Sequence, residues 1–146
     1  MEENKQIKFT LVNKCISLCG MRRSGKSEML HYIVTAEQNK FHKIFCISPR
    51  NVTNDFYNNF IPKENIFNEW SKEWVNDLIE ILKNLNKNKK SQLDSPANIL
   101  LILDDCCSNS KFHQSRTFQK IFTICRHYFL SCIITSQYIT PILILF

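Results

Sequence analysis

The two glycines of this chain constrain its fold more than any other feature. Gly20 and Gly25 are the only glycines among 146 residues, whereas an average usage of about 7% gives about ten in a chain of this length. Both lie in the stretch CISLCGMRRSGKSEML. Glycine is needed where a side chain would block the backbone or where φ is positive. The pair therefore predicts one tight loop whose backbone comes close to another group.

The stretch around the glycines matches the phosphate-binding pattern G-x-x-x-x-G-K-[ST]. An apolar run at 13–20 predicts a buried strand before it, and apolar spacing over 26–38 predicts a helix after it. This context opposes a chance match on an ordinary turn. Lys26 is then expected to reach the β- and γ-phosphates, and Ser27 to bind Mg²⁺ through its hydroxyl. The predicted nucleotide loop comprises Gly20, Met21, Arg22, Arg23, Ser24, Gly25, Lys26 and Ser27.

Two acids follow the apolar run ILLIL at 99–103. Asp104 comes at the carboxyl end of this predicted strand, where it can hold the Mg²⁺ shell. Asp105 is placed to polarise a water for attack on the γ-phosphate. The alternative is a merely polar strand end.

A third polar group, Gln137, ends the next apolar strand, over 131–137. Ligands of open α/β sheets bind at the carboxyl ends of strands, so Gln137 can sense the γ-phosphate or orient water; otherwise it is an ordinary strand terminus. Arg126 precedes this strand. It is either an arginine finger that enters a neighbouring subunit's site or a cation at a helix end. Arg22 and Arg23 add positive potential near the phosphates or face solvent.

Strands and helices alternate along the chain. Four apolar strands are predicted at 13–20, 43–49, 99–105 and 131–137, with an irregular or partly helical connection over 50–67 and a polar loop over 86–98. Helices are predicted over 26–38, after the N-cap Ser71, and over 110–128. Strands that are apolar throughout imply a parallel sheet covered on both faces, hence an α/β fold. The predicted inward residues are Met29, Leu30, Ile33, Val34 and Ala36; then Trp74, Val75, Leu78, Ile81, Leu82 and Leu85; then Phe112, Phe118, Ile121, Phe122 and Cys125.

Composition narrows the class of partner. The net charge of +6 and the pI near 9.0 favour a polyanion such as nucleic acid, or else reflect a generally basic surface. The N-terminus MEENKQIK has no apolar signal region, and the seven cysteines lack C-x2-C spacing. We therefore expect free thiols in a reducing, intracellular setting, without zinc. The run ILILF is too short to span a bilayer.

The segments GMRRSGKS, IFCISP, FYNNFIPKENIF, ILLILDDC and RHYFLSCIITSQ resemble the poxvirus-like DNA-packaging ATPases of large and giant DNA viruses, in the FtsK–HerA branch of P-loop ATPases. The resemblance covers 13–138. It implies a RecA-like P-loop core that uses ATP and Mg²⁺. It also implies a homo-oligomeric ring that moves double-stranded DNA into a capsid with capsid or portal-type proteins, in a host-cell viral factory or the virion.

Carried over by position, the resemblance makes Gly20–Ser27 the nucleotide loop, Asp104 and Asp105 the metal and catalytic acids, and Gln137 the sensor. Arg126 matches the family's "RH" position.

The resemblance also sets an expectation for the C-terminus. Family members continue past the "SQ" strand with a helix and a strand, whereas this chain ends nine residues after Gln137. A further parallel strand needs a crossover of about a dozen residues. We therefore expect one ATPase domain over 1–146, with a core at about 13–138 that is truncated after the fourth strand. The tail, 139–146, is then an antiparallel edge piece or the product of a truncation or frameshift.

Other functions compete with a packaging motor. One alternative is a shortened core that persists as a non-hydrolysing nucleotide- or DNA-binding remnant. A P-loop kinase of small substrates shares the loop, but the chain shows no arginine-rich lid. A GTPase needs Asn-Lys-x-Asp, and the NKNK at 86–89 lacks the acid.

Overall fold

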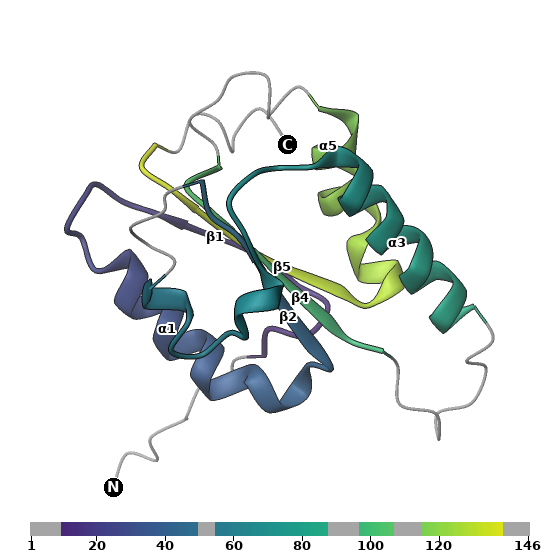
Figure 1. The fold of residues 1–146 in the computed structure, drawn as a ribbon, viewed down its shortest axis with the longest axis horizontal. Helices are drawn as coiled ribbons and strands as arrows, with labels where there is room; N and C mark the ends of the chain where they lie inside the picture. The colour runs from purple at the N-terminus through teal and green to yellow at the C-terminus, as the bar shows by residue number, and fades with distance from the viewer. Residues whose placement is uncertain (1–9, 50–54, 88–96, 107–114, 139–146) are drawn as a thin grey trace, which may run out of the picture.

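The described residues form one parallel sheet with helices on both faces (Figure 1). The computed structural model describes residues 10–49, 55–87, 97–106 and 115–138, and of residues 124–126 the backbone alone. The strand order is β1-β5-β4-β2-β3, and every pairing is parallel. This confirms the predicted α/β class. The strands are β1 (Cys15–Cys19), β2 (Lys43–Ile47), β3 (Ile66–Phe67), β4 (Ile99–Asp104) and β5 (Leu130–Ser136).

Helices cover the two faces unequally. The helix α1 (Lys26–Glu37) packs on one face, and α3 (Lys72–Asn86) and α5 (Arg116–Ile124) pack on the other (Figure 1). Short 3₁₀ turns complete the described elements: η1 (Gln38–Lys40), η2 (Lys63–Asn65) and η4 (Cys125–Tyr128). Each parallel crossover therefore carries a helix, as a parallel sheet requires.

The larger core lies between the sheet and the α3–α5 layer. Ser71 caps α3 as predicted, because its hydroxyl accepts a hydrogen bond from Trp74 N at 3.1 Å. Phe118 of α5 is fully buried against this layer. The buried members of the cluster are Ile47, Val75, Leu78, Ile79, Leu82, Ile99, Leu101, Leu103, Cys106, Phe118, Ile121, Leu130, Cys132 and Ile134.

The second core lies under α1. It combines α1 with residues 55–61, which begin as a single helical turn. The buried Glu37 carboxylate links the segment before β1 to the end of α1. It accepts hydrogen bonds from Leu11 N at 3.0 Å and from Lys40 Nζ at 2.7 Å. The buried members are Leu11, Leu30, Val34, Cys46, Tyr57, Ile61, Leu100, Ile102 and Ile133.

β1 lies at the edge of the sheet and is not the buried strand that was predicted. Its residues alternate, with Cys15, Ser17 and Cys19 exposed and Ile16 and Leu18 half-buried toward α1. The cluster under α3 and α5 contains no β1 residue. One face of this strand is therefore uncovered by the described part of the chain. Among the described strands, β5 alone pairs with β1.

Some predicted inward positions also face solvent. On α3, Ile81 and Leu85 are 55% and 53% exposed, while Ile79 is buried in their place. On α1, Met29 and Ala36 are exposed. The real apolar faces are narrower than predicted because each helix contacts the sheet along one stripe only.

Element boundaries differ in two places. The two-residue strand β3 lies within the connection predicted as irregular, and it pairs with β2. The third helix is described from Arg116 and gives way to η4 at Cys125, whereas 110–128 was predicted as one helix. Phe112, the Cys125 side chain, most of the 86–98 loop and the 139–146 tail lie outside the described residues.

Candidate functional site

The two glycines serve the loop between β1 and α1 for different reasons. Gly25 has φ of +84°, a left-handed conformation that side chains disfavour, and it begins α1 as its N-cap. Gly20 is needed for space: an added Cβ would lie 2.5 Å from Ser24 Oγ. Arg23 also has positive φ, at 62°. The loop is thus a compact turn that favours glycine at its two ends, for space at Gly20 and for backbone conformation at Gly25.

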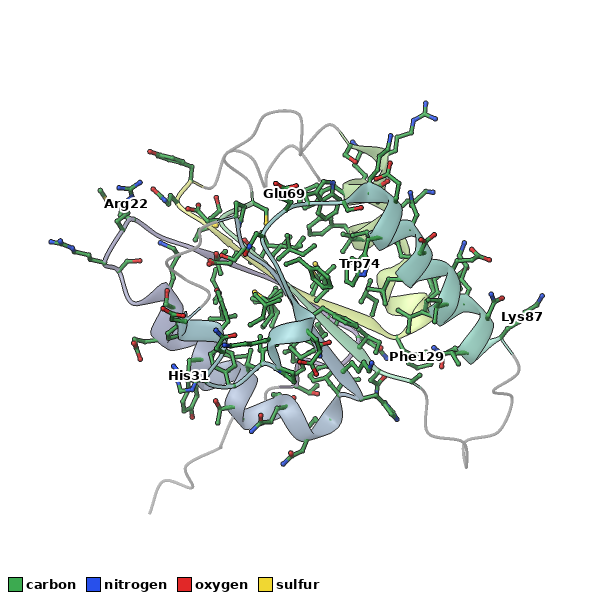
Figure 2. The ribbon with its side chains drawn as sticks, in the orientation of Figure 1. Arg22, His31, Glu69, Trp74, Lys87 and Phe129 are labelled. Atoms are coloured by element: carbon green, nitrogen blue, oxygen red, sulfur yellow. The ribbon has the colours of Figure 1, made fainter. Side chains whose placement is uncertain are left out.

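Lys26 folds back over this loop. Its ammonium donates hydrogen bonds to the carbonyl oxygens of Gly20 and, at 2.8 Å, Met21. Arg22 and Arg23 are exposed, and Arg22 lies on the outer part of the loop (Figure 2). Two arginines, Lys26 and the N-terminus of α1 bring positive charge to the loop side of the site, which suits a phosphate group, while Glu28, Asp104 and Asp105 line the same cavity.

Both predicted acids lie at the carboxyl end of β4. Asp104 Oδ1 accepts a hydrogen bond from Thr135 Oγ1, and Oδ2 accepts one from Ser48 Oγ at 3.2 Å. Asp105 follows with φ of +52°. Its N–H is shared between Thr135 Oγ1 at 3.0 Å and Thr135 O at 3.2 Å. Gln137 Nε2 donates to Asp105 Oδ2 at 3.1 Å.

Buried groups form the floor beneath Asp104. Burial, helped by the Asp104 carboxylate, raises the pKa of the Cys46 thiol well above its usual range. The same two causes raise the pKa of Tyr57, whose side chain is 1% exposed. Both groups therefore stay neutral.

Residues 22–27 of the loop, the two acids and Gln137 line one cavity of about 430 Å³. The structure thus brings together nearly all of the predicted site residues, at the carboxyl ends of β1, β4 and β5. The lining residues are Arg22, Arg23, Ser24, Gly25, Lys26, Ser27, Glu28, Asp104, Asp105, Thr135 and Gln137.

Arg126 is the predicted residue that does not come to this end of the sheet. Its backbone lies in η4, which precedes β5, whereas Gln137 follows β5. Arg126 and Gln137 therefore lie at opposite ends of the strand.

The oxygens present suit a magnesium ion. Ser27 and Asp104 line the same cavity, and a hydroxyl with a carboxylate is the ligand chemistry that Mg²⁺ takes beside nucleotide phosphates. Hydroxyl donors reach both oxygens of Asp104, and a carboxylate oxygen can accept more than one partner.

Sequence reasoning assigned no role to Ser48, Thr135 or Tyr57. Each touches Asp104 from a segment distant in sequence. A hydroxyl after an apolar run carries no local signal, so only the register of the sheet identifies these residues.

Comparison with known proteins places the chain in a viral protein family and beside two further viral proteins. The family model described as "Poxvirus A32 protein" matches residues 5–142. The chain is 23% identical over 137 residues to uncharacterized protein 015R of Frog virus 3, and 28% identical over 127 residues to uncharacterized protein 075L of Invertebrate iridescent virus 6. These matches cover 93% and 87% of this chain, but 41% and 48% of the viral proteins. The chain thus spans less than half the length of these curated relatives.

Solved structures share the fold. The genome-packaging NTPase B204 of Sulfolobus turreted icosahedral virus 2, in complex with AMPPCP, matches with a TM-score of 0.54 and 16% identity, over 87% of this chain and 66% of B204. The pCW3 conjugation coupling protein TcpA with ATPγS has a TM-score of 0.54 and 15% identity, over 86% of this chain and 43% of TcpA. The type VII secretion ATPase EccC of Thermomonospora curvata has a TM-score of 0.59 and 14% identity, over 85% of this chain and 16% of EccC. Within the described ranges, no helix has the length and apolar character to cross a membrane.

Proposed function

The chain belongs to the poxvirus A32 protein family, and from this membership we propose that it binds ATP and hydrolyses it to package viral double-stranded DNA into capsids. The observation that carries the proposal is the meeting of the glycine loop, the acid pair and Gln137 at one cavity. The likeness to B204, a genome-packaging NTPase in complex with a nucleotide analogue, supports it. In this proposal residues 1–146 form one P-loop ATPase domain of the FtsK–HerA type, whose core is 13–138.

In the proposed binding mode the loop surrounds the phosphates of ATP. Residues 20–27 direct backbone N–H groups at the anion, at the positive end of α1. The Lys26 ammonium, which now bonds to Gly20 O and Met21 O, contacts the β- and γ-phosphates instead. Ser27 and Asp104 hold Mg²⁺, which neutralises charge on the phosphate oxygens.

Hydrolysis then follows from Asp105 and Gln137. The Asp105 carboxylate accepts a proton from a water whose oxygen forms a bond to the γ-phosphorus, while the bond from that phosphorus to the β–γ bridging oxygen breaks. Products are ADP and inorganic phosphate. Gln137, through its hydrogen bond to Asp105 Oδ2, fixes the direction of this carboxylate and senses the γ-phosphate beside it.

The partners in this proposal are double-stranded DNA and further copies of the chain. The net charge of +6 favours a polyanion. Because Arg126 lies at the far end of β5 from Gln137, an arginine-finger role requires a neighbouring copy in a homo-oligomeric ring. Capsid or portal-type proteins complete the machine, in the viral factory or the virion.

Steady-state ATP hydrolysis tests the enzyme reading. We expect wild-type protein to release phosphate, faster with double-stranded DNA, and Lys26→Ala to lose this activity; Lys120→Ala, which changes an exposed lysine on α5 outside the cavity, is the control. If wild type and Lys26→Ala hydrolyse ATP at equal rates, the ATPase proposal is wrong. Equal rates near zero, together with Lys26-dependent nucleotide binding, leave the non-hydrolysing binding function in its place.

A further inference from the structure

Thr135 occupies a position between the two acids of the site. It pairs with Asp104 in the register of β4 and β5, and it is 2% exposed. Its side-chain oxygen contacts Asp104 Oδ1 and, at 3.0 Å, Asp105 N. One buried hydroxyl thus touches both the metal-side acid and the water-side acid.

The chemistry of these partners fixes the direction of the hydroxyl. A backbone N–H can only donate, so Thr135 Oγ1 accepts from Asp105 N. The single hydroxyl proton is then left for Asp104 Oδ1. The two hydrogen bonds form a chain that runs from the Asp105 backbone through Thr135 to the Asp104 carboxylate. Such chains polarise and strengthen their members.

The same contact supports an unfavourable backbone. Asp105 has φ of +52°, which a non-glycine residue adopts only where its surroundings hold it. Its N–H reaches Thr135 O as well as Thr135 Oγ1. The conformation turns the Asp105 side chain toward Gln137. Thr135 therefore sets where the second acid points as well as holding the first.

Ser48 completes the arrangement from the other side. It follows β2, is fully buried, and donates to Asp104 Oδ2 at 3.2 Å. Each oxygen of Asp104 thereby receives a hydroxyl from a different neighbouring strand. A carboxylate held at both oxygens cannot rotate without breaking a hydrogen bond, so its open side keeps one direction.

We propose that Thr135 and Ser48 are positioning residues that hold the Asp104 carboxylate ready for the metal, and that Thr135 also sets the position of Asp105 relative to it. This inference rests on the proposed nucleotide site, and neither hydroxyl has a role in the hydrolysis described above. Outer partners that orient a metal ligand typically account for about 10–100-fold in metal affinity.

Magnesium-dependent binding of a nucleotide analogue tests the inference without turnover. A fluorescent, non-hydrolysable ATP analogue is first titrated into the protein in EDTA. Mg²⁺ is then titrated at a fixed concentration of the analogue, and the midpoint of the Mg²⁺ dependence is measured. For Thr135→Val we expect the Mg²⁺ midpoint to rise about 10-fold or more, with affinity in EDTA unchanged within about twofold. Thr135→Ser restores the hydroxyl and should return the midpoint to near the wild-type value.

A matched control is available at Thr117. This threonine is also buried and bonds through Oγ1 to Asn76, on the α3–α5 side of the sheet, so Thr117→Val should leave the midpoint unchanged. If Thr135→Val fails to fold, Ser48→Ala provides the test, with a rise in the same direction. If folded Thr135→Val or Ser48→Ala keeps the wild-type Mg²⁺ midpoint, this inference is wrong but the proposed function is unaffected. Absence of analogue binding by wild type, with and without Mg²⁺, overturns the proposed function as well.

Discussion

Gln137 donates a hydrogen bond from its side-chain amide to Asp105 Oδ2 at 3.1 Å, across the ends of two neighbouring strands. The amide oxygen of Gln137 is left to accept a hydrogen bond from a water or another donor. The pair therefore places a carboxylate and an amide side by side, as the proposed hydrolysis requires.

Replacement of Gln137 should separate binding from turnover. Gln137→Ala removes the amide that holds Asp105, so we expect kcat for ATP hydrolysis to fall about 10²-fold while the KM changes little, because misplacement of a reacting group by about 1 Å costs that much. Phosphate-release kinetics measure both constants. Gln119→Ala, an exposed glutamine on α5, is the control. An unchanged kcat in Gln137→Ala would rule out the role given to this contact.

Replacement of the two glycines should weaken nucleotide binding for different reasons. Gly20→Ala brings Cβ to 2.5 Å from Ser24 Oγ, an overpacking cost of about 1–3 kcal/mol. We expect nucleotide affinity to drop about tenfold or more and to recover in part when Ser24→Ala is added. The Cβ of Gly25→Ala meets no atom within 4 Å. Its loss of nucleotide affinity therefore comes from backbone strain, which Ser24→Ala cannot relieve. Titration with a fluorescent nucleotide distinguishes the cases; equal rescue of both variants would contradict this account.

The cap of α3 should contribute measurably to stability. Ser71→Ala removes the acceptor for Trp74 N, so the free energy of unfolding should fall by about 1 kcal/mol. Ser71→Asp keeps an acceptor at the N-cap and should retain most of the stability. Urea denaturation followed by tryptophan fluorescence measures both. The interpretation fails if the two variants are equally destabilised.

Glu37 predicts a dependence of stability on pH. Burial raises the pKa of its carboxyl, but hydrogen bonds from Lys40 and Leu11 N outweigh burial, so the folded-state pKa lies below 4.5, the usual value for a glutamate carboxyl. The carboxylate therefore stabilises the fold above that pH, and this contribution is lost as the pH falls through the folded-state pKa.

Glu37→Gln tests this dependence. The variant should be less stable than wild type by about 1–3 kcal/mol at pH 7, because it loses hydrogen bonds to a charged group. The difference should shrink at pH 3. Glu80→Gln on α3, whose side chain is 65% exposed, is the matched control. A difference between Glu37→Gln and wild type that is independent of pH would contradict the role of the charge.

Local signals in the sequence were enough to predict the loop, the acids and the cap. Gly25 and Lys26 stand in a fixed pattern, Asp104 ends a continuous apolar run, and Ser71 precedes an amphipathic helix. Each signal lies within a few residues of the structure that it specifies. These elements therefore formed where they were predicted.

The rest depends on contacts between distant segments. The run CISLC reads as buried because cysteine counts as a small hydrophobe, yet the position of β1 at the sheet edge exposes Cys15 and Cys19. The strand β3 is too short for any periodicity to appear. Ser48 and Thr135 meet Asp104 only through the register of three strands. No short stretch of the sequence shows which residues of separate strands lie opposite one another.

The edge position of β1 has a consequence for the loop that it carries. Among the described strands β1 is bonded to β5 alone, from Cys132 N to Lys14 O at one end to Gly20 N to Ser136 O at the other. Hydrogen bonds between strands therefore link the start of the loop to β5 and to no other described strand. β5 is also the strand that carries Thr135 and leads into Gln137. The start of the loop and the side chains that contact the two acids are therefore held by the same strand and the residue that follows it.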